Sequence, residues 1–297
     1  MPESTTAIPK SLTPTPTRFY ETRRLLQRAR RSANVTFGLS MLAVVIALSF
    51  LAPVISHYDP IEMTPADRLL PPSVQHLFGT DSFGRDILTR VLFGGQISIQ
   101  VGLISVSLAL LVGTTLGVIA GFYGGWIDII IMRAIDVMMS FPSILLALVI
   151  VAVLGRSLPN VMLAVGISSI PFYARLVRGS TLSVRSLDYI AAARLIGTPV
   201  WRQMVYHILP NILAPIIVVT TTSIAGAIIS AAALSFLGLG TQPPTPEWGL
   251  MLSDGRAYLR TAWWITFFPG LAIMITVMAI NLLGDGLRDV LDPRLKL

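Results

Sequence analysis

Long apolar runs alternate with short polar stretches along the chain, and six of the runs reach the length of a membrane span. A helix of roughly 20 residues crosses about 30 Å of hydrocarbon and satisfies its own backbone hydrogen bonds, which lipid does not. The pattern therefore predicts an all-α membrane protein with six transmembrane helices, at 35–55, 97–121, 129–154, 161–177, 212–239 and 263–283.

The composition excludes an ordinary soluble protein. Charged residues make up 12% of the chain and hydrophobic residues 54%, whereas about a quarter of the residues in a typical soluble domain are charged. A net charge of +7 would suggest nucleic acid in a soluble protein, but here the basic residues flank apolar runs. Such residues set membrane topology, so no nucleic-acid partner is expected.

The positions of Lys and Arg predict the side of the membrane that each loop occupies. With the N-terminus inside, 16 basic residues fall in cytoplasmic segments and 6 in external ones, as the positive-inside rule requires. We therefore expect a multi-pass protein of the cytoplasmic (inner) membrane with both termini inside. Its expected parts are a cytoplasmic tail 1–34, a first transmembrane helix 35–56 acting as an accessory anchor, an extracytoplasmic segment 57–96, a five-helix core 97–285 with a cytoplasmic loop 178–211, and a cytoplasmic tail 286–297.

Little in the sequence supports catalysis. There are no cysteines, and His57, His76 and His207 lie in different segments, so we expect no metal site and no cluster of nucleophile and base. The only lysines are Lys10 and Lys296, and neither stands in the G-x-x-x-x-G-K-[ST] pattern of a phosphate loop. The chain is therefore predicted to bind no cofactor and to have no ATPase site of its own.

Two further alternatives have weak sequence support. The segment 92–96 reads LFGGQ and superficially resembles the LSGGQ signature of ABC ATPases, but it falls on the predicted outer side. A secondary transporter would carry acidic residues or broken helices in mid-membrane. Only Asp136 and Asp285 come close, and both lie near the ends of predicted spans.

The predicted external segments contain one candidate helix and one rigid loop. Asp81 or Ser82 would cap a short amphipathic helix at the interface, and Gly94–Gly95 would end it before the second span. The proline-rich segment 242–249 would not form a regular helix. Its Trp248 either contacts a binding protein or plugs the pathway, or it anchors the chain at the interface together with Trp263–Trp264.

Some residues within the spans are candidates for a role in the pathway or in gating. Glycines 113, 117 and 121 repeat on one face of the second span, which suits either close static packing or a moving interface. Arg133 and Asp136 lie one turn apart, and we expect a structural ion pair rather than a gate. Pro142, Pro171 and Pro215 would kink their helices.

The predicted cytoplasmic loop contains two short helices joined at a glycine. Helix formers run up to Gly197, which suits a helix C-terminus. Thr198 would cap the second helix, with Pro199 at its first position. The alternative is an ordinary basic loop that only fixes topology. The paired helices would form a compact knob at 186–199, and its three successive alanines, 191–193, would let another surface approach closely.

This loop resembles the EAA loop of binding-protein-dependent ABC importer permeases, because A-A-x-x-x-G is followed after about eleven residues by Leu209–Pro210. Ala191 stands at the family's Glu position and His207 at its Ile position, and Asp188 lies one turn earlier. The wider resemblance is to the second permease subunit of peptide/nickel importers. It rests on the motifs HLFGTD at 76–81, GRD at 84–86, MR at 132–133 with Asp136, Pro142, PPTPEWG at 243–249, and GDGLRD at 284–289 with LDP at 291–293.

The resemblance implies the type I ABC importer permease fold and a subunit that moves a small solute, with ATP and Mg used by partner ATPase subunits. The implied partners are a second homologous permease subunit, two ATPase subunits, an extracytoplasmic solute-binding protein and membrane lipid. Dipeptides or oligopeptides are the favoured solutes, with glutathione and nickel chelates as alternatives. The residues implied in ATPase coupling are Asp188, Tyr189, Ala191, Ala192, Ala193, Gly197, Thr198 and Pro199; those considered for the pathway or for gating are Gly113, Gly117, Arg133, Asp136 and Trp248.

Overall fold

The computed structural model describes residue 30 and residues 32–291. The predictions made for the basic N-terminal tail and for the last residues of the C-terminal tail, including those for Lys10 and Lys296, lie outside the described residues. The described chain is built from helices: α2 Ala33–Phe50, α3 Ala52–Ile55, η1 Pro65–Asp67, α4 Ile87–Tyr123, α5 Gly125–Met139, α6 Ser143–Leu154, α7 Leu158–Arg185, α8 Asp188–Leu195, α9 Val200–Arg202, η2 Gln203–Ile208, α10 Leu209–Phe236, α11 Trp248–Gly255, η3 Arg256–Tyr258 and α12 Trp264–Leu291.

Five of the described helical segments are long and apolar enough to cross a membrane, and a bent pair makes a sixth candidate. Five of the predicted spans correspond to α2, α4, α7, α10 and α12, although most of these helices extend beyond the apolar runs. The helix α12 continues to Leu291, into the segment expected to be a tail. The prediction of an all-α membrane protein is confirmed.

The third predicted span is not one straight helix. It divides into α5 and α6, which are bent by 89° at a short break. Pro142 precedes the first residue of α6 and has an extended ψ of 133°. Proline has no N–H to continue the hydrogen-bond ladder, so the residue expected to kink the span instead divides it.

The prediction of a separate amphipathic helix before the second span is wrong. Asp86, not Asp81 or Ser82, caps the helix, and α4 then runs without interruption through Gly94 and Gly95. These glycines do not end the helix, and neighbouring groups leave no room for a side chain at either position. A Cβ at Gly94 would lie 3.0 Å from the Trp248 ring, and one at Gly95 would come into collision with Ser49.

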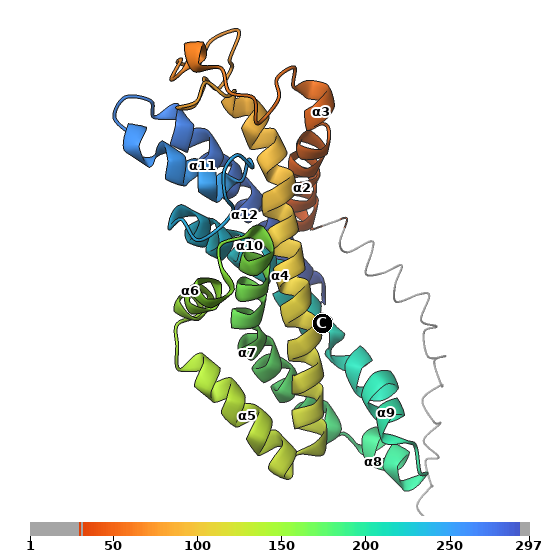
Figure 1. Cartoon of the computed structure of the whole chain (residues 1–297). Helices are drawn as coiled ribbons and strands as arrows, with labels where there is room; N and C mark the ends of the chain where they lie inside the picture. Colours follow the sequence, from red (N-terminus) through yellow and green to blue (C-terminus); the bar gives the residue numbers. More distant parts are fainter. Residues whose placement is uncertain (1–29, 31, 292–297) are drawn as a thin grey trace, which may run out of the picture.

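The bundle of long helices has two ends, each with its own group of short elements (Figure 1). At one end lie the turn between α4 and α5 and the short helices α8 and α9; at the other lie residues 57–86 and α11. We call α8, α9 and the turn 196–199 between them the knob. We call residues 57–86, together with α11 and η3, the cap.

The first span is packed tightly against the last. A Cβ at Gly38 of α2 would lie 2.6 Å from the backbone nitrogen of Leu283, and one at Gly286 of α12 would lie 2.6 Å from Val35. Gln96 of α4 donates a hydrogen bond to the Ser49 carbonyl (2.6 Å). The helix α2 therefore contacts both α12 and α4, which makes it part of the packed bundle.

Candidate functional site: a knob joined to the transmembrane helices

The knob turns at Gly197. This residue has a φ of +76°, and no atom lies within 4 Å of the position that a Cβ would occupy. The N–H of Gly197 donates to the Arg194 carbonyl and the N–H of Thr198 donates to the Ala193 carbonyl, both at 3.0 Å. These two bonds are those of a Schellman motif, which satisfies the last carbonyls of α8. Glycine is therefore required here by backbone conformation and not by space, as the sequence predicted.

The second half of the knob begins differently from the prediction. Pro199, not Thr198, occupies the N-cap position of α9, and no side chain caps that helix. The turn is closed instead by Gln203, a buried residue whose amide nitrogen donates to the Thr198 carbonyl (2.7 Å). The turn is thus fixed by hydrogen bonds on both sides.

One face of the knob is fastened to the spans. Ile190 is fully buried and packs in a cluster with Ile208 and Val177. The Arg194 guanidinium lies 5.4 Å from the ring centre of Phe122 at the end of α4. Ala193 is also buried, whereas Ala191 and Ala192 are exposed. Two of the three alanines are therefore available to an approaching surface.

The opposite face of the knob and its continuation into η2 carry large apolar side chains exposed to the surroundings. Their exposed fractions reach 89% for Leu195 and 81% for Ile196, and the others are Tyr189, Val200, Trp201, Val205 and Tyr206. Large exposed apolar patches mark sites of interaction with proteins or membranes. The acidic Asp188 lies exposed in the first turn of α8, where a negative charge is favoured by the helix dipole.

A π-helical turn connects the knob to the fifth span. Residues of η2 follow α9 directly and continue into α10, so 200–236 form one helical segment. Asn211, in the first turn of α10, donates to the His207 carbonyl of η2 (2.6 Å). Turns of this type are rare and often occur at functional sites. The knob is thus joined to the fifth span by an uninterrupted helical segment.

Two ion pairs hold α5 against α7 near the knob. Arg178 binds Asp128 through two hydrogen bonds of 2.5 Å, and Arg175 binds Asp136 at 2.6 Å. The predicted pair of Arg133 with Asp136 is therefore wrong, because Asp136 finds its partner on another helix. Arg133 is exposed.

The predicted glycine face of the second span packs within the subunit. A Cβ at Gly113 would lie 2.5 Å from Tyr173, and Cβ atoms at Gly117 and Gly121 would lie within 2.7 Å of α7 atoms. This arrangement is the static packing that the sequence allowed. A role of Gly113 and Gly117 in the pathway stays a prediction.

The cap is built around buried charges that the sequence analysis did not identify. The side chain of Arg85 is 1% exposed and donates to Asp81 (2.7 Å), which also accepts hydrogen bonds from two backbone N–H groups. Asp86 contacts His76 at 3.0 Å, and Arg90 lies 3.6 Å from Asp81. The spacing of Asp81 and Arg85, four residues apart around Gly84, was a signal for this pair that the sequence analysis did not use.

Trp248 is a buried packing residue and not an interfacial anchor. It is 2% exposed, and its indole nitrogen donates to the Val91 carbonyl (2.9 Å). It is also the first residue of α11, so the segment expected to be non-helical ends at Glu247, two residues earlier than predicted. Trp264 is likewise buried and donates to the Thr80 carbonyl (3.1 Å), which leaves only Trp263 of that pair exposed.

Two carboxyl groups at α11, that of its N-cap residue Glu247 and that of Asp254 within the helix, are shifted toward the protonated form. Burial raises the pKa of Glu247, although the hydrogen bonds that it accepts from the N–H groups of Gly249 and Leu250 favour the charged form. Burial also raises the pKa of Asp254, against the opposite effect of the positive charges on Arg85 and Arg90.

The long apolar helices are those of a multi-pass membrane protein. Residues 113–297 match the model of the family described as binding-protein-dependent transport system inner membrane component, and residues 22–72 match the N-terminal transmembrane domain of oligopeptide transport permease C. The chain belongs to this family of inner membrane components and is a permease subunit of an ABC importer.

Curated relatives are similar over nearly their full length. A dipeptide transport system permease protein of Alkalihalophilus pseudofirmus is 48% identical over 92% of this chain and 90% of its own. A glutathione transport system permease protein of Pectobacterium atrosepticum is 49% identical over 90% of this chain and 89% of its own. The fold is shared with a solved amino acid ABC transporter with histidines, at a TM-score of 0.52 and 15% identity, over 67% of this chain and 93% of that chain.

Proposed function

We propose that this chain pairs with a second permease subunit to carry small peptides into the cell, and that its knob receives the force of separate ATPase subunits. The observation that carries the proposal is the knob itself. Its outer face exposes Leu195 and Ile196, its inner face is buried against the spans, and it continues into α10 through η2. Such a body converts a displacement of a bound motor into a displacement of a helix.

The energetic requirement on this coupling is simple. A motor shifts the equilibrium between two arrangements of the spans only by the difference between its affinities for them. A change from a 1:99 to a 99:1 ratio requires about 5.5 kcal/mol. An exposed apolar surface such as that of the knob suits tight contact with a partner protein, and the two knob-face alanines Ala191 and Ala192 permit close approach.

The topology proposed for this importer places the knob inside and the cap outside. The support is the excess of basic residues in the tail and in the segments on the knob side. Leu195→Cys, at a position 89% exposed, should react with a membrane-impermeant thiol reagent only from the inside, and Val74→Cys, 96% exposed, only from the outside. The absence of native cysteines makes each signal specific, and labelling of position 195 from outside would reverse the proposed orientation.

Peptides are the proposed solutes, delivered by an extracytoplasmic binding protein. The relatives named above are described as transporting dipeptides or glutathione, and glutathione is itself a tripeptide. ATP and Mg would be used by the partner subunits, because neither lysine of this chain stands in a phosphate-loop pattern.

The test is uptake by the complete complex in proteoliposomes. With ATP and the binding protein, labelled dialanine should accumulate inside, and accumulation should persist when ionophores collapse the ion gradients. The subunit purified alone should hydrolyse no ATP. Uptake driven by an ion gradient without the ATPase subunits would refute the proposal in favour of a secondary transporter.

A further inference from the structure

A groove between α4 and α10 opens close to the knob. Its volume is about 440 Å³, and one of its ends is formed by Leu209, the first residue of α10 after η2. Four threonines and six aliphatic residues line it: Thr114, Thr115, Thr220, Thr221, Leu110, Leu111, Leu209, Leu213, Ile216 and Ile217. Leu111 is 70% exposed at its edge. The groove thus combines an apolar wall with hydroxyl groups and contains no charged side chain.

The hydroxyl groups in the groove fall into two kinds. Thr115 and Thr221 donate to carbonyls of their own helices, at 2.7 and 3.0 Å. The hydroxyl oxygens of Thr114 and Thr220 are buried and have no hydrogen-bond partner in the described part of the chain. An unsatisfied buried hydroxyl costs free energy, and helical threonines usually avoid this cost by bonding to a carbonyl of the preceding turn.

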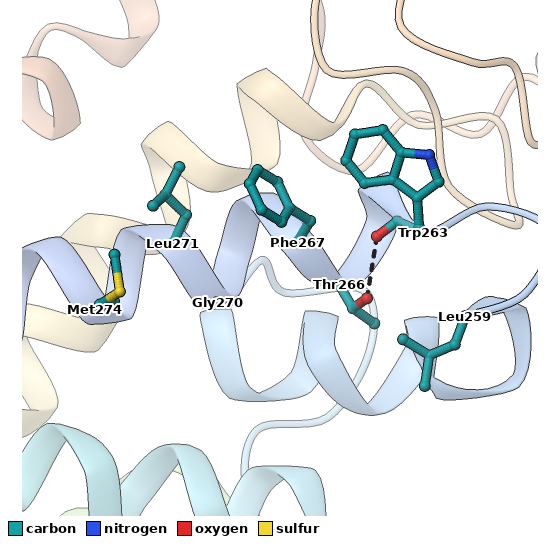
Figure 2. Close-up of a pocket in the computed structure, with 7 residues that line it drawn as sticks. All are labelled: Leu259, Trp263, Thr266, Phe267, Gly270, Leu271 and Met274. Atoms are coloured by element: carbon teal, nitrogen blue, oxygen red, sulfur yellow. Dashed lines mark hydrogen bonds between the residues drawn. The ribbon is translucent and has the colours of Figure 1, made fainter.

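A second hollow of similar size shows that an apolar depression on this protein need not contain such groups (Figure 2). It is lined by Leu259 and Trp263, which precede α12, and by Phe267 and other residues of α12. Its one hydroxyl, on Thr266, is already bonded to the Trp263 carbonyl at 3.1 Å. The only other polar side-chain group in the lining is the indole N–H of Trp263, which belongs to a half-exposed side chain. No hydroxyl is left unpaired in this hollow, which suits contact with lipid. The groove between α4 and α10 differs because it has two unpaired hydroxyls.

We propose that the α4–α10 groove is a solute-contact surface near the knob, and that Thr114 and Thr220 bind main-chain amide groups of the transported peptide. This inference rests on the proposed function. A hydroxyl both donates and accepts, so it serves a peptide N–H or C=O equally. The oxygens are covered in this conformation, and separation of α4 from α10 during the transport cycle exposes them. Because no charge lines the groove, the contact is independent of the peptide's side chains.

Variants that lack one of the two hydroxyls distinguish a contact with the solute from a role in packing. Thr114→Val and Thr220→Val keep the shape of the side chain. If the hydroxyls were only structural, both variants would be as stable as the wild type or more so and would transport normally, because an unpaired polar group has been removed. The proposal expects the same stability but about fivefold less dialanine uptake per complex, the loss of roughly one hydrogen bond. Thr222→Val is the matched control, since its hydroxyl bonds to the Val219 carbonyl and lies outside this groove.

Charged peptides test whether the two hydroxyls bind the main chain of the transported peptide or its side chains. Dialanine, Ala-Glu and Ala-Lys should lose uptake by the same factor in Thr114→Val and in Thr220→Val, since the bonds are to the main chain. Loss confined to one of the charged peptides would overturn the main-chain assignment. Normal uptake of all three by both variants would overturn the contact itself.

Thiol labelling decides the inference independently of the solute. Leu111→Cys in the complete complex should react with a charged, hydrophilic thiol reagent without nucleotide and lose this reactivity when ATP and vanadate trap the motor. Val44→Cys, 58% exposed on α2, should react in neither state. If Leu111→Cys never reacts in the complex, a partner helix or lipid fills the groove and the inference fails. If the wild type transports no dialanine, the proposed solute class fails, while the labelling still decides whether the groove is part of the pathway.

Discussion

The knob and the cap lie at opposite ends of the molecule and are built in opposite ways. The knob exposes Leu195 and Ile196 almost completely, and its turn depends on the backbone conformation of Gly197. The cap buries the charges of Asp81 and Arg85. The knob therefore presents apolar surface to its surroundings, whereas the cap encloses charged groups.

The difference has a physical consequence for how each end responds to substitution. Apolar surface in contact with water is unfavourable until a partner covers it, so changes on the knob should act on assembly and coupling. A buried ion pair was desolvated when the chain folded, and removal of one member leaves an uncompensated charge. Changes in the cap should therefore act on folding. This comparison predicts which variants lose stability and which lose only activity.

Trp248→Ala should show the largest loss of stability. Truncation of a buried tryptophan costs about 3–5 kcal/mol, and the lost bond to the Val91 carbonyl adds about 1 kcal/mol. Thermal unfolding of the purified subunit in detergent measures this loss. Trp263→Ala, at a position 51% exposed, should change the midpoint little. Equal midpoints for the two variants would show that the buried tryptophan of the cap contributes no more to stability than an exposed one.

Asp81→Asn should show the second-largest loss of stability, about 3 kcal/mol, because the buried guanidinium of Arg85 loses the carboxylate that it contacts at 2.7 Å and keeps only the more distant Asp254, at 3.9 Å. Glu62→Gln removes the charge of an exposed acid in the same part of the cap, residues 57–86, and should cost less than about 0.5 kcal/mol. The comparison fails if both variants unfold at the same temperature, since the buried pair would then contribute nothing.

Much of the fold follows from the sequence, because span length and hydrophobic patterning are local properties. The turn at Gly197 was also predictable, since helix formers precede it and its conformation depends on the backbone alone. The break at Pro142 was only half predictable. A missing N–H shows where a helix is weak, but the 89° bend depends on how α5 and α6 each pack against α7.

Pairing between distant residues was not predictable from local spacing. Asp136 has Arg133 within one turn but pairs with Arg175, because tertiary packing brings α7 closer in the required geometry. Trp248 lies in a segment that is rich in proline and typical of an exposed loop. Its buried site is formed by α4, where Gly94 and Gly95 leave room for the ring and the Val91 carbonyl accepts its N–H. A side chain that fills a site made by another helix leaves no signal in its own segment.

Leu195→Ser tests the exposed surface of the knob. It should leave the unfolding midpoint of the subunit unchanged, because the side chain contributes little to the fold. It should weaken binding of the ATPase subunits by about 1–2 kcal/mol, roughly tenfold in the dissociation constant, if this leucine is central to the contact. Titration of the ATPase subunit onto immobilised permease gives the value. Unchanged affinity would place the motor contact elsewhere on the knob.

Gly197→Val tests the angle of the knob with a smaller effect on free energy. A side chain at positive φ costs about 1 kcal/mol or more. The variant should insert and pair normally but transport fewer solute molecules for each ATP hydrolysed. Gly179→Val is the control, because that glycine lies in the regular helix α7 with no atom within 4 Å of a Cβ. Wild-type coupling in Gly197→Val would show that this turn does not position the motor contact.

The smallest expected effect is the pH dependence contributed by Asp254 in the cap. Its pKa is raised by burial, so the folded state holds its proton to a higher pH than the unfolded chain does. Stability therefore falls as the pH rises from about 4, the ordinary pKa of an aspartate, through the raised value, and is constant above it. Asp254→Asn removes the ionisation, so it should flatten the fall in stability above about pH 4 while leaving the stability at lower pH unchanged.

The measurement is the unfolding midpoint from pH 4 to pH 8, with Glu62→Gln as a control in which loss of an exposed acid should leave the slope intact. The buried Glu247 acts in the same direction, so the slope should decrease in Asp254→Asn without disappearing. If Asp254→Asn gives the same curve as the wild type, the partial exposure of this carboxyl, 27% for its side chain, is enough for water to solvate its charge, and the enclosure of charge in the cap ends at Asp81 and Arg85.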